Sequence, residues 1–159
     1  MRVSQFLFAI VLCGSLSGIA RAEPLPKFED CPVSVQSKHA AVPRLQFADA
    51  QGRRYRTVIR DATNASVNFA GHHVLATWGC GSSCIMAAAI DVESGRVISL
   101  PFTISDWPMG VTEPLSFRAN SCLLVVRGSR NENTERGTYY YSFDGKVFTL
   151  RASEKESRR

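Results

Sequence analysis

The side chains best suited to chemistry lie in one short stretch, Asn68–Cys84. Its nucleophilic or metal-binding residues are two histidines, two cysteines and two serines: His72, His73, Cys80, Cys84, Ser82 and Ser83. A cysteine or serine becomes a nucleophile when a histidine base lies within hydrogen-bond reach and a carboxylate orients that base. Asp91 or Asp106 is the carboxylate that such a hydrolase would use. The same stretch could instead support thiol–disulfide exchange through the two cysteines, or zinc binding by the cysteines and histidines.

The spacing of these residues disfavours each of these chemistries. Successive strand residues point to opposite faces, so His72 and His73 share one site only if the strand begins after them. We therefore expect one histidine at the surface and the other packed. Redox enzymes usually place two residues between their cysteines at a helix start, whereas three separate Cys80 from Cys84 in a β context. Ser82 lacks the flanking glycine pattern of a nucleophile elbow, Gly-x-Ser-x-Gly. No catalytic residue, cofactor or metal is therefore predicted.

The cysteine count predicts two disulfides. Removal of residues 1–22 would leave four cysteines, and an even number in an oxidising compartment favours pairing. Three connectivities are possible, of which we favour Cys80–Cys84 and Cys31–Cys122. The chain-entropy relation gives about 2 kcal/mol for the short ring and about 4.6 kcal/mol for the long one. The short bridge is therefore expected to fix a local shape rather than to supply most of the stability.

That local shape is a glycine- and serine-rich loop clipped by the Cys80–Cys84 bridge. Glycines allow backbone angles closed to other residues, and serines add hydrogen-bonding groups. Such a loop can present a rigid binding surface, or it can be only a turn between two strands. If it binds, the contact residues that we predict are His72, His73, Trp78, Gly81, Ser82, Ser83 and Trp107.

Short β-rich runs separated by turn signals predict a single β domain over residues 43–151. We expect an all-β fold: an antiparallel meander of hairpins that forms a sandwich or a partly open barrel. The clearest hairpin joins Tyr139–Phe143 to Lys146–Leu150 through Asp144-Gly145, a dipeptide that favours positive φ at both positions. Alternation places three aromatic residues on one face, where they should join the core: Tyr139, Tyr141 and Phe143.

Other repeats of this pattern extend the meander. Turn glycines like Gly145 recur at Gly95 and, more faintly, at Gly52. We expect the basic residues within 53–56, after Gly52, to lie on a solvent-exposed face of a strand. The uninterrupted apolar runs Ile85–Ile90 and Leu123–Val126 predict central strands that are covered on both faces.

The N-terminus predicts export. Arg2 precedes an apolar run over residues 6–19, and Ala20-Arg21-Ala22 offers the small residues at which a signal peptidase cuts. We therefore predict a signal peptide at residues 1–22 and a periplasmic or secreted protein. The apolar run is too short to span a bilayer, so no membrane span is expected after cleavage. Residues 23–42 are expected to be an irregular lead-in and residues 152–159 a flexible tail.

The charge balance argues against a nucleic-acid partner. The 159-residue chain carries a formal net charge of +5, and losing Arg2 and Arg21 with the signal peptide leaves +3. The remaining positive residues are scattered and have no clear aromatic stacking platform among them. A protein or a small-molecule ligand is the expected partner.

Two segments of the stretch resemble a known signature. Asn68-Phe69-Ala70-Gly71, a hydrophobic strand, then Trp78-Gly79-Cys80-Gly81 and Cys84 are similar to a shared segment of uncharacterised small exported bacterial proteins. The resemblance is strong over Asn68–Cys84 and weaker as far as Gly95. It implies a common fold and export, and no catalytic residues. The sequence thus predicts an exported, non-catalytic binding or accessory protein, of the kind that can inhibit a partner by filling its cleft. The alternative is a cysteine or serine hydrolase, or a thiol–disulfide protein, that uses Cys80 and Cys84 with a nearby histidine.

Overall fold

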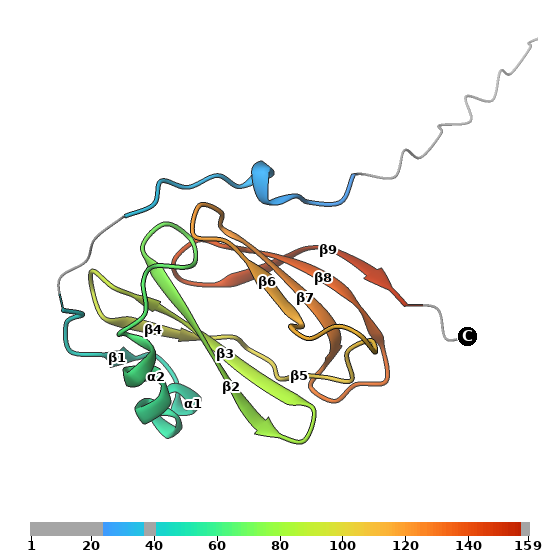
Figure 1. Ribbon diagram of the computed structural model, residues 1–159, viewed down its shortest axis with the longest axis horizontal. Helices are drawn as coiled ribbons and strands as arrows, with labels where there is room; N and C mark the ends of the chain where they lie inside the picture. The colour runs from blue at the N-terminus through green and yellow to red at the C-terminus, as the bar shows by residue number, and fades with distance from the viewer. Residues whose placement is uncertain (1–23, 37–40, 157–159) are drawn as a thin grey trace, which may run out of the picture.

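The computed structural model describes residues 24–36 and 41–156, and strands make up most of its regular structure (Figure 1). The predicted signal peptide lies outside the described residues. In chain order the elements are η1 (Phe28–Asp30), β1 (Gln46–Phe47), α1 (Ala50–Arg54), α2 (Arg56–Ala62), β2 (His73–Gly81), β3 (Cys84–Asp91), β4 (Arg96–Ser99), β5 (Ile104–Ser105), β6 (Leu115–Phe117), β7 (Leu123–Arg130), β8 (Arg136–Phe143) and β9 (Phe148–Lys155). The strands form one sheet in the order β1-β4-β3-β5-β7-β8-β9, with β2 paired to β3 and β6 paired to β7. The predicted all-β fold is confirmed.

The two faces of the β2–β3 hairpin pack into two different cores. On one face Leu75, Ala87 and Ala89 meet aliphatic and aromatic residues of β7 and β8. On the other face Val74, Trp78 and their neighbours meet Ile59 of α2. Figure 1 shows α1 and α2 lying beside β2 and β4, with β6 to β9 in the other half of the molecule. Because β5 pairs with both β3 and β7, it links the two halves of the bent sheet.

The central and core assignments of the sequence are confirmed. β3 pairs with β2, β4 and β5, and β7 pairs with β5, β6 and β8, so both apolar runs lie inside the sheet. The side chains of Tyr139, Tyr141 and Phe143 are all buried. The alternation of residues along β8 is sufficient to predict which side chains are buried, because one face of β8 is covered and the other is not.

The turn between β8 and β9 is longer than the predicted two-residue loop. Phe143 pairs with Phe148, so four residues connect the strands. Only Gly145 has positive φ, at 87°. Asp144 instead uses its carboxylate, which accepts hydrogen bonds of 2.8 Å from the backbone N–H groups of Lys146 and Val147. An Asx-type cap thus replaces the tighter turn.

The region around Gly52 is helical, which corrects the prediction of a hairpin and of a basic strand face there. Asp49 caps α1 by accepting a 2.7 Å hydrogen bond from the Gly52 N–H. Ile59 of α2 is fully buried against β2. β1, just before α1, pairs in parallel with β4, so the sheet is not wholly antiparallel.

The lead-in is tied to one end of the sheet. Apart from η1 its described residues are irregular, as expected. The Cys31–Cys122 disulfide and an isolated bridge between Pro32 and Ser121 fasten it to the start of β7. Figure 1 shows this segment passing along the edge of the molecule where β6 and β7 meet.

β9 extends past the predicted end of the β domain at residue 151. Ala152 pairs with Tyr140 and the pairing continues to Lys155, so residues 152–155 are strand rather than tail. A register shift leaves Arg151 as an extra, bulged residue in β9. No helix in the described part of the chain is long and apolar enough to cross a membrane.

Candidate functional site

The predicted site residues separate to opposite ends of β2. His73 begins this nine-residue strand, whereas Cys80 and Gly81 end it. At about 3.3 Å per residue the two ends lie roughly 26 Å apart. Neither His72 nor His73 can therefore act as a base for Cys80 or Ser82, nor join the cysteines in a zinc site. The geometry excludes those versions of the hydrolase and zinc hypotheses.

The distal end of the hairpin is the predicted clipped loop. The Cys80–Cys84 disulfide is formed, as is Cys31–Cys122, so both favoured pairings are present. Gly79 pairs with Ile85 and Gly81 with Cys84, which leaves Cys80 as a bulged residue. The bulge brings the two cysteines close enough to bridge across the turn. Ser82 and Ser83 form the exposed turn itself.

Beside this turn lies a cavity of about 370 Å³. Its lining residues come from the turn, from β5 and its following segment, and from the β7–β8 loop: Ser82, Ser83, Cys84, Ser105, Asp106, Trp107 and Glu132. The structure thus brings Trp107 next to the serine loop, and binding by these residues stays a prediction. The two segments meet because Cys84 of β3 pairs with Ser105 of β5.

Gly128 allows the Trp107 segment to lie close against β7. Its φ is 130°, which disfavours other residues. A Cβ at this position would lie 2.5 Å from the carbonyl oxygen of Ser105 and 3.4 Å from Cα of Trp107. The close approach of Ser105 and Trp107 to β7 thus depends on a residue without a side chain.

Left-handed backbone gathers around the cavity. Ser83, Asp106 and Glu132 have φ values of 50°, 45° and 57°, and all three line it. They are three of the five non-glycine residues with positive φ in the described part of the chain. Such residues cost free energy and concentrate at functional sites, where the surrounding structure holds them in place.

A second cavity of about 710 Å³ continues from the first and shares Ser105, Asp106 and Glu132 with it. Its other lining residues are Asn133, Thr134, Glu135, Arg136, Lys155 and Glu156. We call the two cavities together the acidic groove, because four carboxylates line it against two cations. Arg136 pairs with Asp106 at 3.5 Å and with Glu156 at 2.5 Å, and Lys155 pairs with Glu135 at 2.9 Å. The smaller cavity has no basic residue in its lining.

Trp78 is not a surface contact residue, which corrects the prediction. It lies in the core beneath α2, with only 9% of its surface exposed. Its ring packs at a tilt against Tyr55, with 5.3 Å between centroids. Alternation along β2 turns Trp78 to the helix-covered face, whereas the exposed Gly81 belongs to the loop.

His72 and His73 meet at the other end of the hairpin, contrary to the expectation that they face apart. Their ring centroids are 4.3 Å apart. His72 precedes the strand, so alternation does not apply to it. His73 is packed, with 3% of its surface exposed, whereas His72 is half-buried and not the surface residue that was expected. Asp91 lies opposite His73 in the ladder.

Burial of His73 makes the stability of the fold depend on pH. Desolvation lowers the pKa of His73, against the opposing hydrogen bond to the Ala70 carbonyl. In the unfolded chain the imidazole of His73 is therefore protonated near pH 6.5, whereas in the folded protein it is protonated only at lower pH. Acidification through that interval is expected to destabilise the fold, and the stability is fully present above about pH 6.5. Urea unfolding in metal-free buffer, from about pH 7.5 to 5, would measure this; an unchanged free energy would contradict it, and His73→Gln should flatten the dependence.

Comparison of the chain with protein-family models, with curated proteins and with solved structures found no match. The structure defines a class of protein: a disulfide-bridged, mainly β protein with left-handed backbone in the loops at both ends of the β2–β3 hairpin. The predicted membership in a family of small exported bacterial proteins stays a prediction.

Proposed function

We propose that this protein is an exported, non-catalytic binding protein whose acidic groove holds a positively charged segment of a partner protein. The observation that carries the proposal is the convergence of Ser83, Asp106 and Glu132, all in left-handed backbone, around one cavity beside Trp107. Export is supported by the predicted signal peptide and by two disulfides, which are typical of oxidising compartments.

The chemistry of the groove suits a lysine or arginine side chain. Asp106 and Glu132 are exposed carboxylates that line both cavities of the groove. Arg136, which pairs with Asp106, lines only the larger cavity, so the carboxylates face the smaller one without a cation in its lining. The half-buried Trp107 offers an aromatic surface on which an aliphatic stem or a cationic head can pack. The groove is also acidic within a basic chain, so it can attract a partner that the rest of the surface repels.

Rigidity supports binding rather than catalysis at this end. The disulfide and the β3–β5 and β5–β7 pairings fix the three segments before a partner arrives. Such preorganisation reduces the entropy lost on binding. The polar, open groove differs from the enclosed apolar pockets that hold most small molecules, which favours a protein partner. Thiol–disulfide exchange has no comparable support, since Cys80 lies in a strand and not at the start of a helix that would lower its pKa.

A charged model peptide tests the proposal. We expect a fluorescein-labelled peptide of repeating Gly-Lys to bind the protein, and its Gly-Glu counterpart not to bind, in a fluorescence anisotropy titration. The double variant Asp106→Asn, Glu132→Gln should weaken binding about fivefold, because two exposed charge interactions of roughly 0.5 kcal/mol each are lost.

The matched control removes two exposed acids elsewhere, Asp61→Asn and Glu93→Gln. This variant has the same net charge as the groove variant and should bind within twofold of the parent protein. Equal weakening by both variants would mean that only net charge attracts the peptide. Equal binding of both peptides would also overturn the proposal.

A further inference from the structure

The opposite end of the β2–β3 hairpin carries a second site. We propose that His72, His73 and Asp91 bind a divalent transition-metal ion of the zinc type. Each residue offers one ligand atom, and these atoms all lie within 4.8 Å of one another. His73 and Asp91 are direct partners in the β2–β3 ladder, and the Val92 N–H donates a 3.1 Å hydrogen bond to the His72 carbonyl. The site lies at the far end of β2 from the acidic groove and does not depend on the groove's function.

His73 is held in the form that a metal requires. Its Nδ1 lies 3.2 Å from the carbonyl oxygen of Ala70. A carbonyl only accepts hydrogen bonds, so Nδ1 carries the proton and Nε2 keeps a free lone pair. This carbonyl–imidazole contact is the arrangement that orients metal-binding histidines in other proteins. The edge-to-face contact with Phe143, at 5.0 Å between centroids, further fixes the ring. Burial also lowers the pKa of His73, which keeps the ring neutral.

Asp91 can supply the anionic ligand. Its Oδ1 accepts hydrogen bonds from the N–H groups of Glu93 and Ser94, and its Oδ2 accepts one from the Ser94 hydroxyl at 2.7 Å. Two oxygens offer about four acceptor positions, so one remains on Oδ2. Burial raises the pKa of Asp91, but these hydrogen bonds outweigh that effect and the net pKa is lowered. Asp91 is therefore an oriented carboxylate with a free lone pair.

The turn before β2 holds the two histidines together. Ala70 and Gly71 have φ values of 45° and 83°, so the chain reverses tightly and Phe69 bridges to His73. Three backbone hydrogen bonds anchor this turn: Ala70 N–H to the Ser121 carbonyl, Gly71 N–H to the Ala119 carbonyl, and Gln36 N–H to the Gly71 carbonyl. A Cβ on Gly71 would lie 2.7 Å from the Ser34 carbonyl oxygen. The Asn-Phe-Ala-Gly segment thus has a structural purpose, and strained backbone again marks a candidate site.

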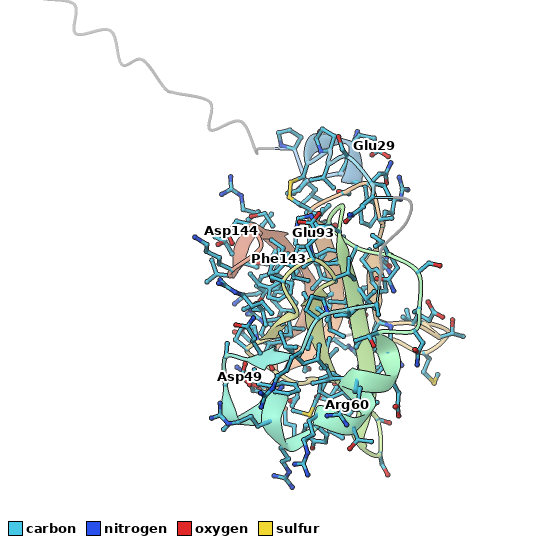
Figure 2. The ribbon with its side chains drawn as sticks, turned by 90° about the vertical axis from the view of Figure 1, so that its left-hand side faces the viewer. Glu29, Asp49, Arg60, Glu93, Phe143 and Asp144 are labelled. Carbon is cyan, nitrogen blue, oxygen red and sulfur yellow. A yellow bond between two sulfur atoms is a disulfide. The ribbon has the colours of Figure 1, made fainter. Side chains whose placement is uncertain are left out.

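The ligand set selects the metal. Two imidazoles and one carboxylate suit Zn²⁺ and its transition-metal neighbours, whereas Mg²⁺ and Ca²⁺ prefer oxygen ligands. Tetrahedral zinc needs donor atoms about 3.4 Å apart, from bonds of about 2.1 Å. Because the side chain of His72 is only half-buried, it can move to bring the donor atoms to this distance. The cluster is partly exposed, which leaves a fourth coordination position for water. Figure 2 labels Phe143, whose ring contacts His73, well away from Asp49 and Arg60.

Metal titration of the protein, purified without a polyhistidine tag and stripped with EDTA, tests the proposal. We expect one equivalent of Zn²⁺ to bind and to raise the thermal unfolding temperature, and Mg²⁺ to do neither. Co²⁺ should bind with the visible absorption of a four-coordinate site. His72→Ala should weaken Zn²⁺ binding at least about 100-fold and Asp91→Asn at least about tenfold, since even residues that only orient ligands contribute 10- to 100-fold.

A matched control removes an exposed acid that is not part of the cluster. Glu93→Gln should bind Zn²⁺ within about twofold of the parent protein. Should His72→Ala unfold without metal, Asp91→Asn decides the question, because its amide oxygen can still accept the turn hydrogen bonds. Absence of a one-to-one Zn²⁺ complex would overturn the site, as would undiminished binding by both variants; the histidines would then be a packed pair only.

Discussion

Replacing Cys31 and Cys122 together by alanine is expected to lower the free energy of unfolding by about 4.6 kcal/mol. The bridge closes a ring with a sequence separation of 91 residues, so its loss frees a large loop in the unfolded chain. Its loss also releases the lead-in, which borders the turn that holds the two histidines. Guanidinium unfolding monitored by circular dichroism would measure the change.

The Cys80→Ala, Cys84→Ala variant is the matched control. It removes the same atoms from a ring with a sequence separation of only 4 residues, for which the same relation gives about 2 kcal/mol. Similar losses for the two double variants would contradict an entropic origin. The two bridges are also expected to have different roles. Loss of the short bridge should affect peptide binding at the acidic groove more than it affects the free energy of unfolding.

The Phe69→Ala variant is expected to lose about 4 kcal/mol of stability, within the usual range for a buried phenylalanine. Phe69 is fully buried between the two halves of the sheet. Its ring stacks on Phe143 and Phe148 at 5.5 and 6.3 Å between centroids, and meets Phe117 edge-on at 6.2 Å. The cavity left by alanine touches residues of three strands and cannot collapse easily. Urea unfolding of parent and variant would give the difference.

The same truncation at Phe28 provides the comparison. Phe28 is only half-buried in the lead-in, where its ring contacts the Arg118 guanidinium at 4.4 Å. Phe28→Ala is expected to cost about 1 kcal/mol, since little cavity forms at an exposed edge. If Phe69→Ala proved no more harmful than Phe28→Ala, the aromatic cluster would not be the centre of the core.

Local patterns were enough to predict most of the strands. The alternation in Tyr139–Phe143 predicts which residues are buried, because successive strand residues point to opposite faces. The apolar run Ile85–Ile90 predicts a strand that is covered on both faces. The helices around Gly52 lack such a signal, since α1 and α2 together span too few turns to show a helical period. The parallel β1–β4 pair joins residues far apart in sequence, and no short window contains both.

The candidate site shows the same division. The serine turn and its disulfide follow from local spacing, and the structure places Trp107 beside them. Glu132 was missed because it reaches the groove only through the β7–β8 loop, and nothing near it in sequence indicates that. The meeting of His72 and His73 was missed for another reason. The residues Ala70-Gly71 before them signal a turn, which removes His72 from the strand and from the rule of alternating faces.

The outer edge of β9 has a consequence for how the protein behaves among its copies. The strand order ends at β9, so its outer backbone groups could in principle template a strand from a second chain. Three features oppose this: the bulge at Arg151, the exposed charges of Glu154 and Lys155, and the short length that remains on either side. Charged and bulged edges are the usual defence against edge-to-edge aggregation. Glu154 and Lys155, which extend the sheet beyond its expected end, therefore also oppose pairing with a strand of a second copy.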